Sequence, residues 1–134
     1  MSQENVEIVR RLAAAFDNGS IEAMRPLLDP ELVWHEDPSF PEAGVYRGRD
    51  EWEAYARQFL AEFAAIRYEE GPGETVEAGD NVVVNILIHG HGTTSGAEFD
   101  LSAWWAFTLR DGKVVRCFSY LDRDAALEAV GLSE

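Results

Sequence analysis

The chain has 134 residues, of which 46% are hydrophobic and 11% aromatic, and its 25 Asp and Glu against 11 Lys and Arg give a net charge of −14. This length suits a single domain over residues 1–134, and the apolar content excludes an intrinsically disordered chain. Because the negative charge is spread along the whole sequence, it argues against binding to nucleic acid or to an anionic membrane surface.

Cysteine usage and hydropathy indicate where the protein works. The lone Cys117 permits no intrachain disulfide, and we interpret it as a small core residue. The charged first segment is unlike a signal peptide, and no apolar run reaches the roughly 20 residues of a membrane helix. We therefore expect a cytoplasmic protein.

Apolar residues recur at helical spacing through residues 6–16, which predicts a first helix with Ser2 as a candidate N-cap and Gly19 at its end. Ser20 can cap a short second helix, and Pro26 should stop that helix.

A third helix is predicted from Asp50, its candidate N-cap, with Glu53 completing a reciprocal capping pattern. Its apolar residues recur three or four positions apart, as one face of a helix requires: Trp52, Tyr55, Ala56, Phe59, Leu60 and Phe63.

From Ile66 to Leu121 the chain alternates β-rich runs with turn residues, and Asp111-Gly112 predicts a tight hairpin. A last helix should start after Asp122 and end at Gly131. Helices followed by an antiparallel meander predict an α+β fold with the helices on one sheet face.

Alternation along the strands sorts side chains into two faces. Val82, Val84, Ile86 and Ile88 form an apolar set that should face the helices. Leu87 and Trp104 lie on the opposite, more polar face, which indicates that a second subunit covers that face and predicts a homodimer.

Three stretches, ENVEIVRRLAAAFDNGSIEAMRPLLDPELVWHED, FPEAGVYRGRDEW and LRDGKVVRCFSYLDRDAALEAVGL, resemble the SnoaL-like, ketosteroid-isomerase-like branch of the nuclear transport factor 2-like superfamily. The resemblance spans nearly the whole chain. It implies a cone-shaped domain in which a curved antiparallel sheet wraps around helices, with a pocket at the open end and homodimers as the usual state. Members include isomerases, cyclases, hydrolases and binding domains without chemistry, so the reaction stays open.

The segment His35-Glu36-Asp37-Pro38 resembles the stretch that carries the general-base aspartate of ketosteroid isomerase, which implies Asp37 as the base and His35 as a second catalytic candidate. Strand alternation favours Glu36 instead, because Leu32, Trp34 and Glu36 share one face. A solvated acidic loop is the third interpretation.

The isomerase's two oxyanion donors are not retained: their positions align with Leu12 and Trp105. An indole N–H can still polarise a carbonyl, so Trp105 is a catalytic candidate, with a core aromatic as the alternative. The predicted pocket lining is Trp34, Glu36, Tyr55, Phe59, Phe63, Phe107 and Ser119.

His89 and His91 share one strand face, with Glu98 seven residues after His91, which leaves a metal site as a minor alternative to two exposed histidines. We expect no metal and no cofactor. The sequence therefore predicts a pocket for a small hydrophobic molecule with metal-free acid–base chemistry, and a non-catalytic binding or dimerisation module is the alternative.

Overall fold

The computed structural model describes residues 2–39, 44–92 and 96–132. In chain order its elements are α1 (Ser2–Asp17), α2 (Ile21–Met24), the 3₁₀ turn η1 (Arg25–Leu27), β1 (Leu28–Glu36), β2 (Val45–Arg47), α3 (Arg49–Ala61), β3 (Phe63–Glu70), β4 (Val76–Ala78), β5 (Asn81–Gly92), β6 (Glu98–Arg110), β7 (Lys113–Tyr120) and α4 (Arg123–Ala129).

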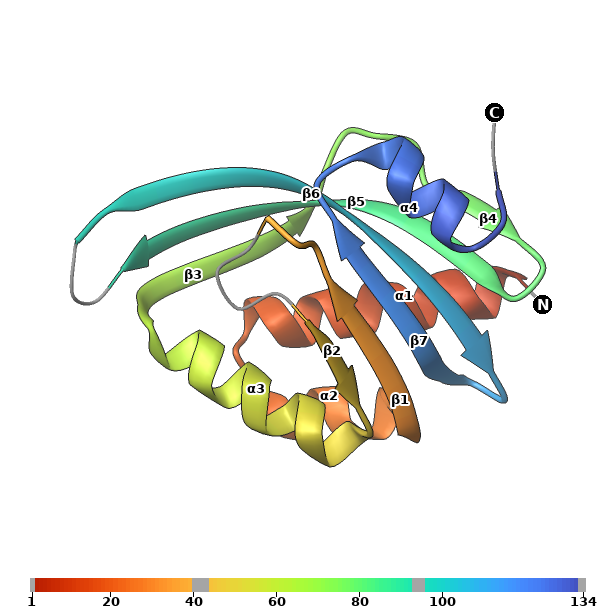
Figure 1. Ribbon diagram of the computed structural model, residues 1–134, viewed down its shortest axis with the longest axis horizontal. Coiled ribbons are helices and arrows are strands. Elements are labelled where there is room, and N and C mark those ends of the chain that lie inside the picture. The colour runs from red at the N-terminus through yellow and green to blue at the C-terminus, as the bar shows by residue number, and fades with distance from the viewer. Residues whose placement is uncertain (1, 40–43, 93–95, 133–134) are drawn as a thin grey trace.

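The strands form one curved sheet in the order β2-β1-β7-β6-β5-β3, and β4 pairs with β5 off this path (Figure 1). The α+β class is confirmed, and β5, β6 and β7 form the expected antiparallel meander. The predicted order of helices followed by the strands of a meander is incomplete, because β1 and β2 lie between the second and third helices. β1 also runs parallel to β7, which its distance from β7 along the chain allows, since no hairpin joins the two.

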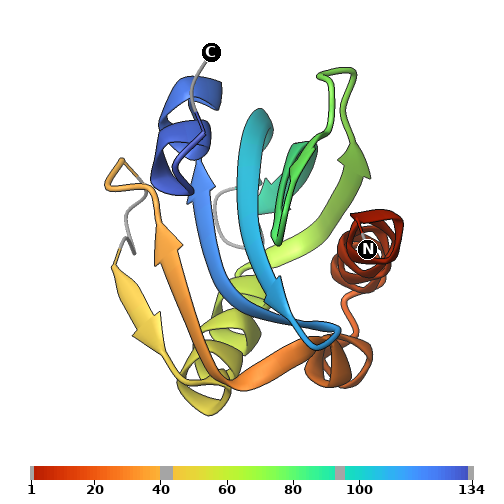
Figure 2. The same ribbon diagram turned by 90° about the vertical axis from the view of Figure 1, so that its right-hand side faces the viewer.

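Helices cover both faces of the sheet. The larger core cluster joins α1 and α3 to the concave face, and the smaller one joins α4 to the opposite face (Figures 1 and 2). The set Val82, Val84, Ile86 and Ile88 belongs to the larger cluster, as strand alternation predicts. The expectation that helices cover only one face is corrected by α4.

The short second helix is capped as expected, because the backbone N–H of Ala23 donates to Ser20 Oγ at 3.1 Å. Two other predicted boundaries are wrong. Ser2 lies inside α1, and α3 begins after Gly48, so Asp50 lies in its first turn and makes no cap. Phe63, the last member of the predicted helical face, begins β3, because α3 ends at Ala61.

The C-terminal segment follows the sequence prediction closely. Asp111 and Gly112 both have positive φ, 53° and 78°, as a tight hairpin turn between β6 and β7 requires. The carboxylate of Asp122 caps α4 by accepting from the N–H of Ala125 at 3.0 Å, and Gly131 ends the helix with φ 79°.

Trp104 is half-buried within the chain itself. It packs into the cluster under α4, the guanidinium of Arg123 lies 5.7 Å from its ring centroid, and its indole lies against Gly73. One of the two observations behind the predicted homodimer is thereby explained in part without a second subunit, and the homodimer stays a prediction.

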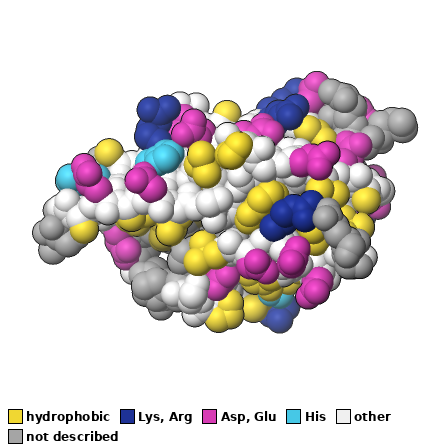
Figure 3. All heavy atoms as spheres, turned by 90° about the horizontal axis from the view of Figure 1, so that it is seen from above, with side chains coloured by type: hydrophobic (Ala, Val, Ile, Leu, Met, Phe, Trp, Pro, Cys, Tyr) yellow, Lys and Arg dark blue, Asp and Glu magenta, His cyan; other side chains and the backbone are white. Residues whose placement is uncertain are grey.

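Acidic side chains are scattered over the face that Figure 3 shows, and histidine side chains lie among them towards one end. Within residues 2–39, 44–92 and 96–132, no helix combines the length and the hydropathy needed to cross a membrane.

Candidate active site

A cavity of about 540 Å³ opens between the concave face of the sheet and helices α1 and α3. Its wall is mostly aromatic and aliphatic, and of the described residues no Lys, Arg or His lines it. The lining residues are Phe16, Trp34, Glu36, Ser39, Trp52, Tyr55, Ala56, Phe59, Leu60, Glu62, Phe63, Tyr68, Ile88, Phe99, Leu101, Trp105, Ser119 and Leu121.

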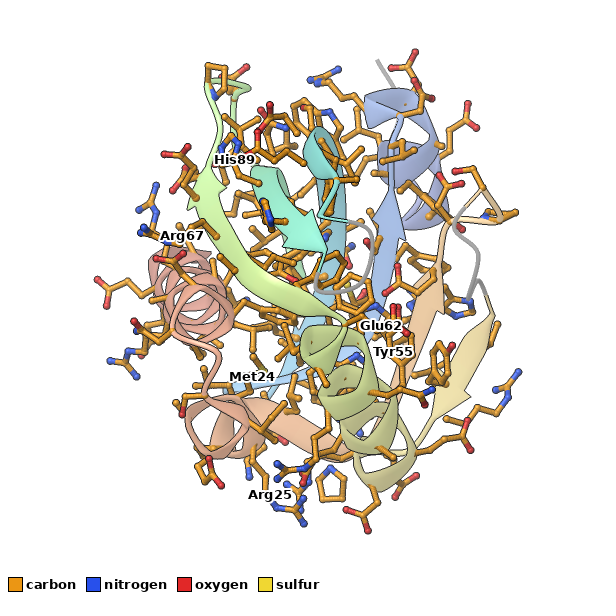
Figure 4. All side chains as sticks on the ribbon, turned by 90° about the vertical axis from the view of Figure 1, so that its left-hand side faces the viewer. Met24, Arg25, Tyr55, Glu62, Arg67 and His89 are labelled. Carbon is orange, nitrogen blue, oxygen red and sulfur yellow. The ribbon has the colours of Figure 1, made fainter. Side chains whose placement is uncertain are left out.

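The carboxyl group of Glu36 is part of this wall and is mostly buried. Glu36 ends β1, where strand alternation turns it to the same side as Leu32 and Trp34. The indole N–H of Trp34 donates to Glu36 Oε2 at 3.0 Å, and the hydroxyl of Tyr55 donates to the same oxygen at 3.2 Å. Figure 4 shows Tyr55 projecting from α3 towards β1 and β2.

Burial raises the pKa of Glu36 from 4.5 to about 7. The donors Trp34 and Tyr55 and the hydroxyl of Ser119 favour the charged form and oppose this rise, while the nearby charge of Asp37 adds to it. Desolvation dominates because no cation among the described residues lines the cavity. Both protonation states of Glu36 are therefore populated near neutral pH.

Glu36, Ser119 and Trp105 form a row across three neighbouring strands. Glu36 pairs with Ser119 in the β1–β7 register, and Ser119 pairs with Trp105 in the β7–β6 register. Two strand spacings separate Glu36 from Trp105, roughly 9–10 Å between backbones. Trp105 is buried, and its indole Nε1 has no hydrogen-bond partner among the described residues.

Tyr68 on β3 is a polar cavity residue that the sequence analysis missed. Its ring is buried, 5.1 Å from Phe16 and 5.9 Å from Trp105 between centroids. Burial, and then the charge of Glu36, raise the pKa of its hydroxyl well above the ordinary value. No described residue hydrogen-bonds that hydroxyl. The sequence marks Tyr68 only as a member of a strand in which apolar and polar residues alternate. Many core tyrosines have the same position, so this pattern does not identify a cavity residue.

Asp37 does not line the cavity. Its Oδ1 accepts from the backbone N–H and the hydroxyl of Ser39 at 2.8 and 2.7 Å, and its Oδ2 accepts from the N–H of Leu121 at 3.0 Å. These hydrogen bonds lower the pKa of Asp37 against the opposing effect of partial burial. They tie the segment after β1 to the end of β7, at the cavity mouth.

His35 lies on the opposite face of β1 from the cavity. Its ring stacks on Phe118 with centroids 4.3 Å apart. Burial, and then the charges of Arg47 and Arg116, lower the pKa of His35. The residue therefore belongs to an outer aromatic and basic surface.

Of the predicted lining, six members line the cavity: Trp34, Glu36, Tyr55, Phe59, Phe63 and Ser119. Phe107 does not line it. It lies behind the wall, fully buried, with its ring centroid 5.9 Å from that of Trp105 and 6.2 Å from that of Trp34.

The histidine pair of β5 is engaged with carboxylates outside the cavity. His89 contacts Asp100 and Glu69, which together raise its pKa, and His91 lies 3.5 Å from Glu98. In the part of the chain that the structure describes, no three His, Cys, Asp or Glu side chains are placed to hold a metal ion. Cys117 is fully buried, and desolvation raises its pKa, as suits a core thiol.

Comparison with known proteins supplies the family. A family model described as a SnoaL-like domain matches residues 9–117. No curated protein matches the chain. Many solved structures match it.

Three of these similar structures are described here by name, sequence identity and coverage. An NTF2-like protein from Burkholderia xenovorans LB400 has 27% identity and a TM-score of 0.74, covering 96% of this chain and 97% of its own. A candidate SnoaL-like polyketide cyclase from Jannaschia sp. CCS1 has 22% identity and a TM-score of 0.76, covering 99% and 95%. TerC, co-crystallised with polyporic acid, has 23% identity and a TM-score of 0.76, covering 93% and 96%.

Proposed function

The chain belongs to the SnoaL-like domain family, and we propose that its cavity binds a small, largely apolar molecule with which Glu36 exchanges a proton. The observation that carries the proposal is a carboxyl group, held by Trp34 and Tyr55, in the wall of a 540 Å³ apolar cavity, where burial raises its pKa to about 7. A general acid–base group works best when its pKa lies near the working pH. A cavity of this size and lining is typical of small-molecule sites.

The chemistry that suits this arrangement is proton transfer next to a carbonyl group. Ionised Glu36 removes a proton from the carbon beside the carbonyl, the electron pair of that C–H bond forms the C=C bond of an enolate, and the π pair of the carbonyl moves onto its oxygen. Return of the proton from Glu36 to another atom of the enolate isomerises the ligand. Alternatively the enolate carbon attacks a second carbonyl and closes a ring, and Glu36 returns the proton to the alkoxide that this attack forms. Trp34 and Tyr55 hold the carboxylate in place through Oε2, and neither of these two bonds involves Oε1.

The structure of TerC with polyporic acid and the relationship to a candidate polyketide cyclase support an organic ligand of this kind. Asp37 and His35, the catalytic candidates from the sequence, play supporting parts in this proposal because neither lines the cavity. Trp105 keeps its candidate role as a hydrogen-bond donor to the ligand. A cytoplasmic location and a homodimer stay predictions of the sequence.

A non-catalytic binding module is the second candidate. It is favoured by Leu12, which stands where ketosteroid isomerase has an oxyanion donor and which is fully buried in the core. Such a protein would bind the same class of molecule without exchanging a proton.

One experiment separates the two candidates. The methyl protons of 2-acetylnaphthalene, a small and largely apolar ketone, are followed by NMR in D₂O with the wild-type protein and with Glu36→Gln. The proposal expects both proteins to bind the ketone and only the wild type to accelerate exchange. Binding without acceleration by the wild type favours the binding module, and absence of binding by this ketone and by larger polycyclic ketones refutes the proposed ligand class.

A further inference from the structure

Tyr46 lies outside the cavity and packs on Tyr55, one of the two donors to Glu36. It is the middle residue of β2, at the edge of the sheet, and it pairs with Trp34 in the β1–β2 register. Paired residues of neighbouring strands project from the same face, so Tyr46 lies on the face that carries Trp34 and Glu36. Its ring stacks on the ring of Tyr55 with centroids 4.1 Å apart and planes 18° apart. Tyr46 is not one of the residues that line the cavity.

The stack restrains a hydroxyl group for which water can compete. Tyr55 is half-buried, and a half-buried hydroxyl can exchange a protein acceptor for water at little cost. The hydroxyl donates to Glu36 Oε2 at 3.2 Å, which is long for an O–H···O hydrogen bond, so a small rotation of the ring would break it. The ring of Phe59 also contacts Tyr55, but its centroid is 6.0 Å away, and the Tyr46 stack is the closer of these two contacts.

The strand that carries Tyr46 is held at both sides. The backbone N–H of Glu36 donates to the carbonyl of Gly44 at 3.0 Å, which ties the start of β2 to the end of β1. The backbone N–H of Arg47 donates to the carboxylate of Glu51 in the first turn of α3 at 3.1 Å. These bonds fix β2 relative to both β1 and α3, and the ring of Tyr46 therefore has a fixed place beside Tyr55.

We propose that Tyr46 is a positioning residue for Glu36: its ring holds Tyr55 in the orientation from which the hydroxyl donates to Glu36, and it thereby sets the balance between the charged and the neutral carboxyl group. The inference rests on the proposed function, in which Glu36 exchanges a proton with the ligand. Loss of the ring should free Tyr55, weaken a hydrogen bond to the charged form and raise the pKa of Glu36 above its value of about 7. The alternative is that Tyr46 only packs an edge strand, in which case its loss lowers stability and leaves the ionisation of Glu36 unchanged.

The titration of Glu36 tests the inference without any ligand. The ¹³C-labelled side-chain carboxyl carbon of Glu36, identified by its loss in Glu36→Gln, is followed by NMR from pH 5 to pH 9. Tyr46→Ile removes the ring but keeps a residue that is favoured in strands, and Tyr46→Phe keeps the ring. Val45→Ala is the control, because Val45 lies on the same strand and projects from its opposite, exposed face. Tyr46→Leu replaces Tyr46→Ile if that variant does not fold.

We expect Tyr46→Ile to lower the acid dissociation constant of Glu36 about two- to fivefold. This is part of the about three- to tenfold decrease that the loss of one hydrogen bond implies for Tyr55→Phe. Tyr46→Phe and Val45→Ala should retain the wild-type constant. In a Tyr55→Phe background, Tyr46→Ile should have no further effect, because the donor through which Tyr46 acts is already absent.

An unchanged constant in Tyr46→Ile overturns the inference, and so does an equal decrease in Tyr46→Phe or Val45→Ala. An effect of Tyr46→Ile that persists in the Tyr55→Phe background also overturns it, because Tyr46 would then act by another route.

Proton exchange of 2-acetylnaphthalene gives the second readout. The midpoint of its pH profile should move to higher pH in Tyr46→Ile by the same factor as the titration of Glu36, and a midpoint that does not move overturns the inference. If the wild type catalyses no exchange while the titration shifts as expected, the proposed function fails and the control of Glu36 by Tyr46 stands. If exchange occurs and the titration does not shift, the proposed function stands and the role of Tyr46 is refuted.

Discussion

Replacing Glu36 by glutamine should change how the stability of the protein depends on pH. The folded protein holds the pKa of Glu36 at about 7 against an ordinary value of 4.5. Below pH 4.5 the group is neutral in both the folded and the unfolded chain and contributes no pH dependence. Between 4.5 and 7 the unfolded chain ionises first, so the free energy of unfolding falls as pH rises.

At about 1.4 kcal/mol per pKa unit, the full penalty above pH 7 amounts to about 3 kcal/mol. Between pH 5 and pH 8, linkage gives a loss of about 2.5 kcal/mol. The amide introduced by Glu36→Gln carries no charge, so the variant should gain that amount relative to the wild type over the same interval. The other titrating groups are present in both proteins and cancel in the comparison.

Urea unfolding of both proteins at pH 5, 6, 7 and 8 measures this difference, which corresponds to a relative shift of roughly 1–2 M in the urea midpoint. Glu53→Gln is the control. Arg57 and Arg25 lower the pKa of Glu53, so its contribution is lost only as pH falls below the ordinary carboxyl range, and the stability gap to the wild type should stay constant from pH 5 to pH 8. A gap for Glu36→Gln that is equally constant would refute the elevated pKa and, with it, the basis of the proposed function.

Three further outcomes follow from the hydrogen bonds. Tyr55→Phe removes a hydrogen-bond donor to the charged form of Glu36 and should raise the pKa of Glu36 further. In the same urea series, the free energy of unfolding that this variant loses relative to the wild type should therefore grow by about 0.5–1.5 kcal/mol between pH 7 and pH 9. A loss that does not depend on pH would contradict the hydrogen bond. Asp37→Ala loses three accepted hydrogen bonds and should cost about 1–2 kcal/mol in urea unfolding while keeping ketone proton exchange; a stable variant without exchange would return the catalytic role to Asp37. Asp122→Ala removes the cap of α4 and should lower the thermal midpoint by roughly 3–5 °C, measured by circular dichroism, and an unchanged midpoint would show that the cap is dispensable.

Local rules predicted the parts of the fold that depend on near neighbours. The Asp111-Gly112 hairpin, the cap at Ser20 and the apolar alternation of β5 need only a few adjacent residues, and all three are present. The same alternation turns Glu36 inward along β1. The resemblance alone pointed to Asp37, one residue further on, and in a strand a shift of one residue reverses the face.

Contacts between distant segments could not be obtained in this way. Tyr68 meets Trp105 because β3 and β6 curve around the same cavity with β5 between them, and no spacing in the sequence reports that curvature. Phe63 kept helical periodicity beyond the last turn of α3, since periodicity does not mark where the chain leaves a helix. Phe107 follows the inward alternation of β6 correctly, but side-chain packing decides whether an inward residue reaches the cavity or lies behind its wall.

The energetic cost of Glu36 is itself an argument for a function at this position. At neutral pH the ionisation of Glu36 lowers the free energy of unfolding. The loss is a large fraction of the about 5–15 kcal/mol by which an ordinary domain is stable. A glutamine in place of Glu36 would keep an acceptor for Trp34 and Tyr55 and would remove the penalty. The stability of the fold therefore gives no reason for a carboxyl group there, while proton exchange with a ligand does, because it needs a group whose charge changes near the working pH.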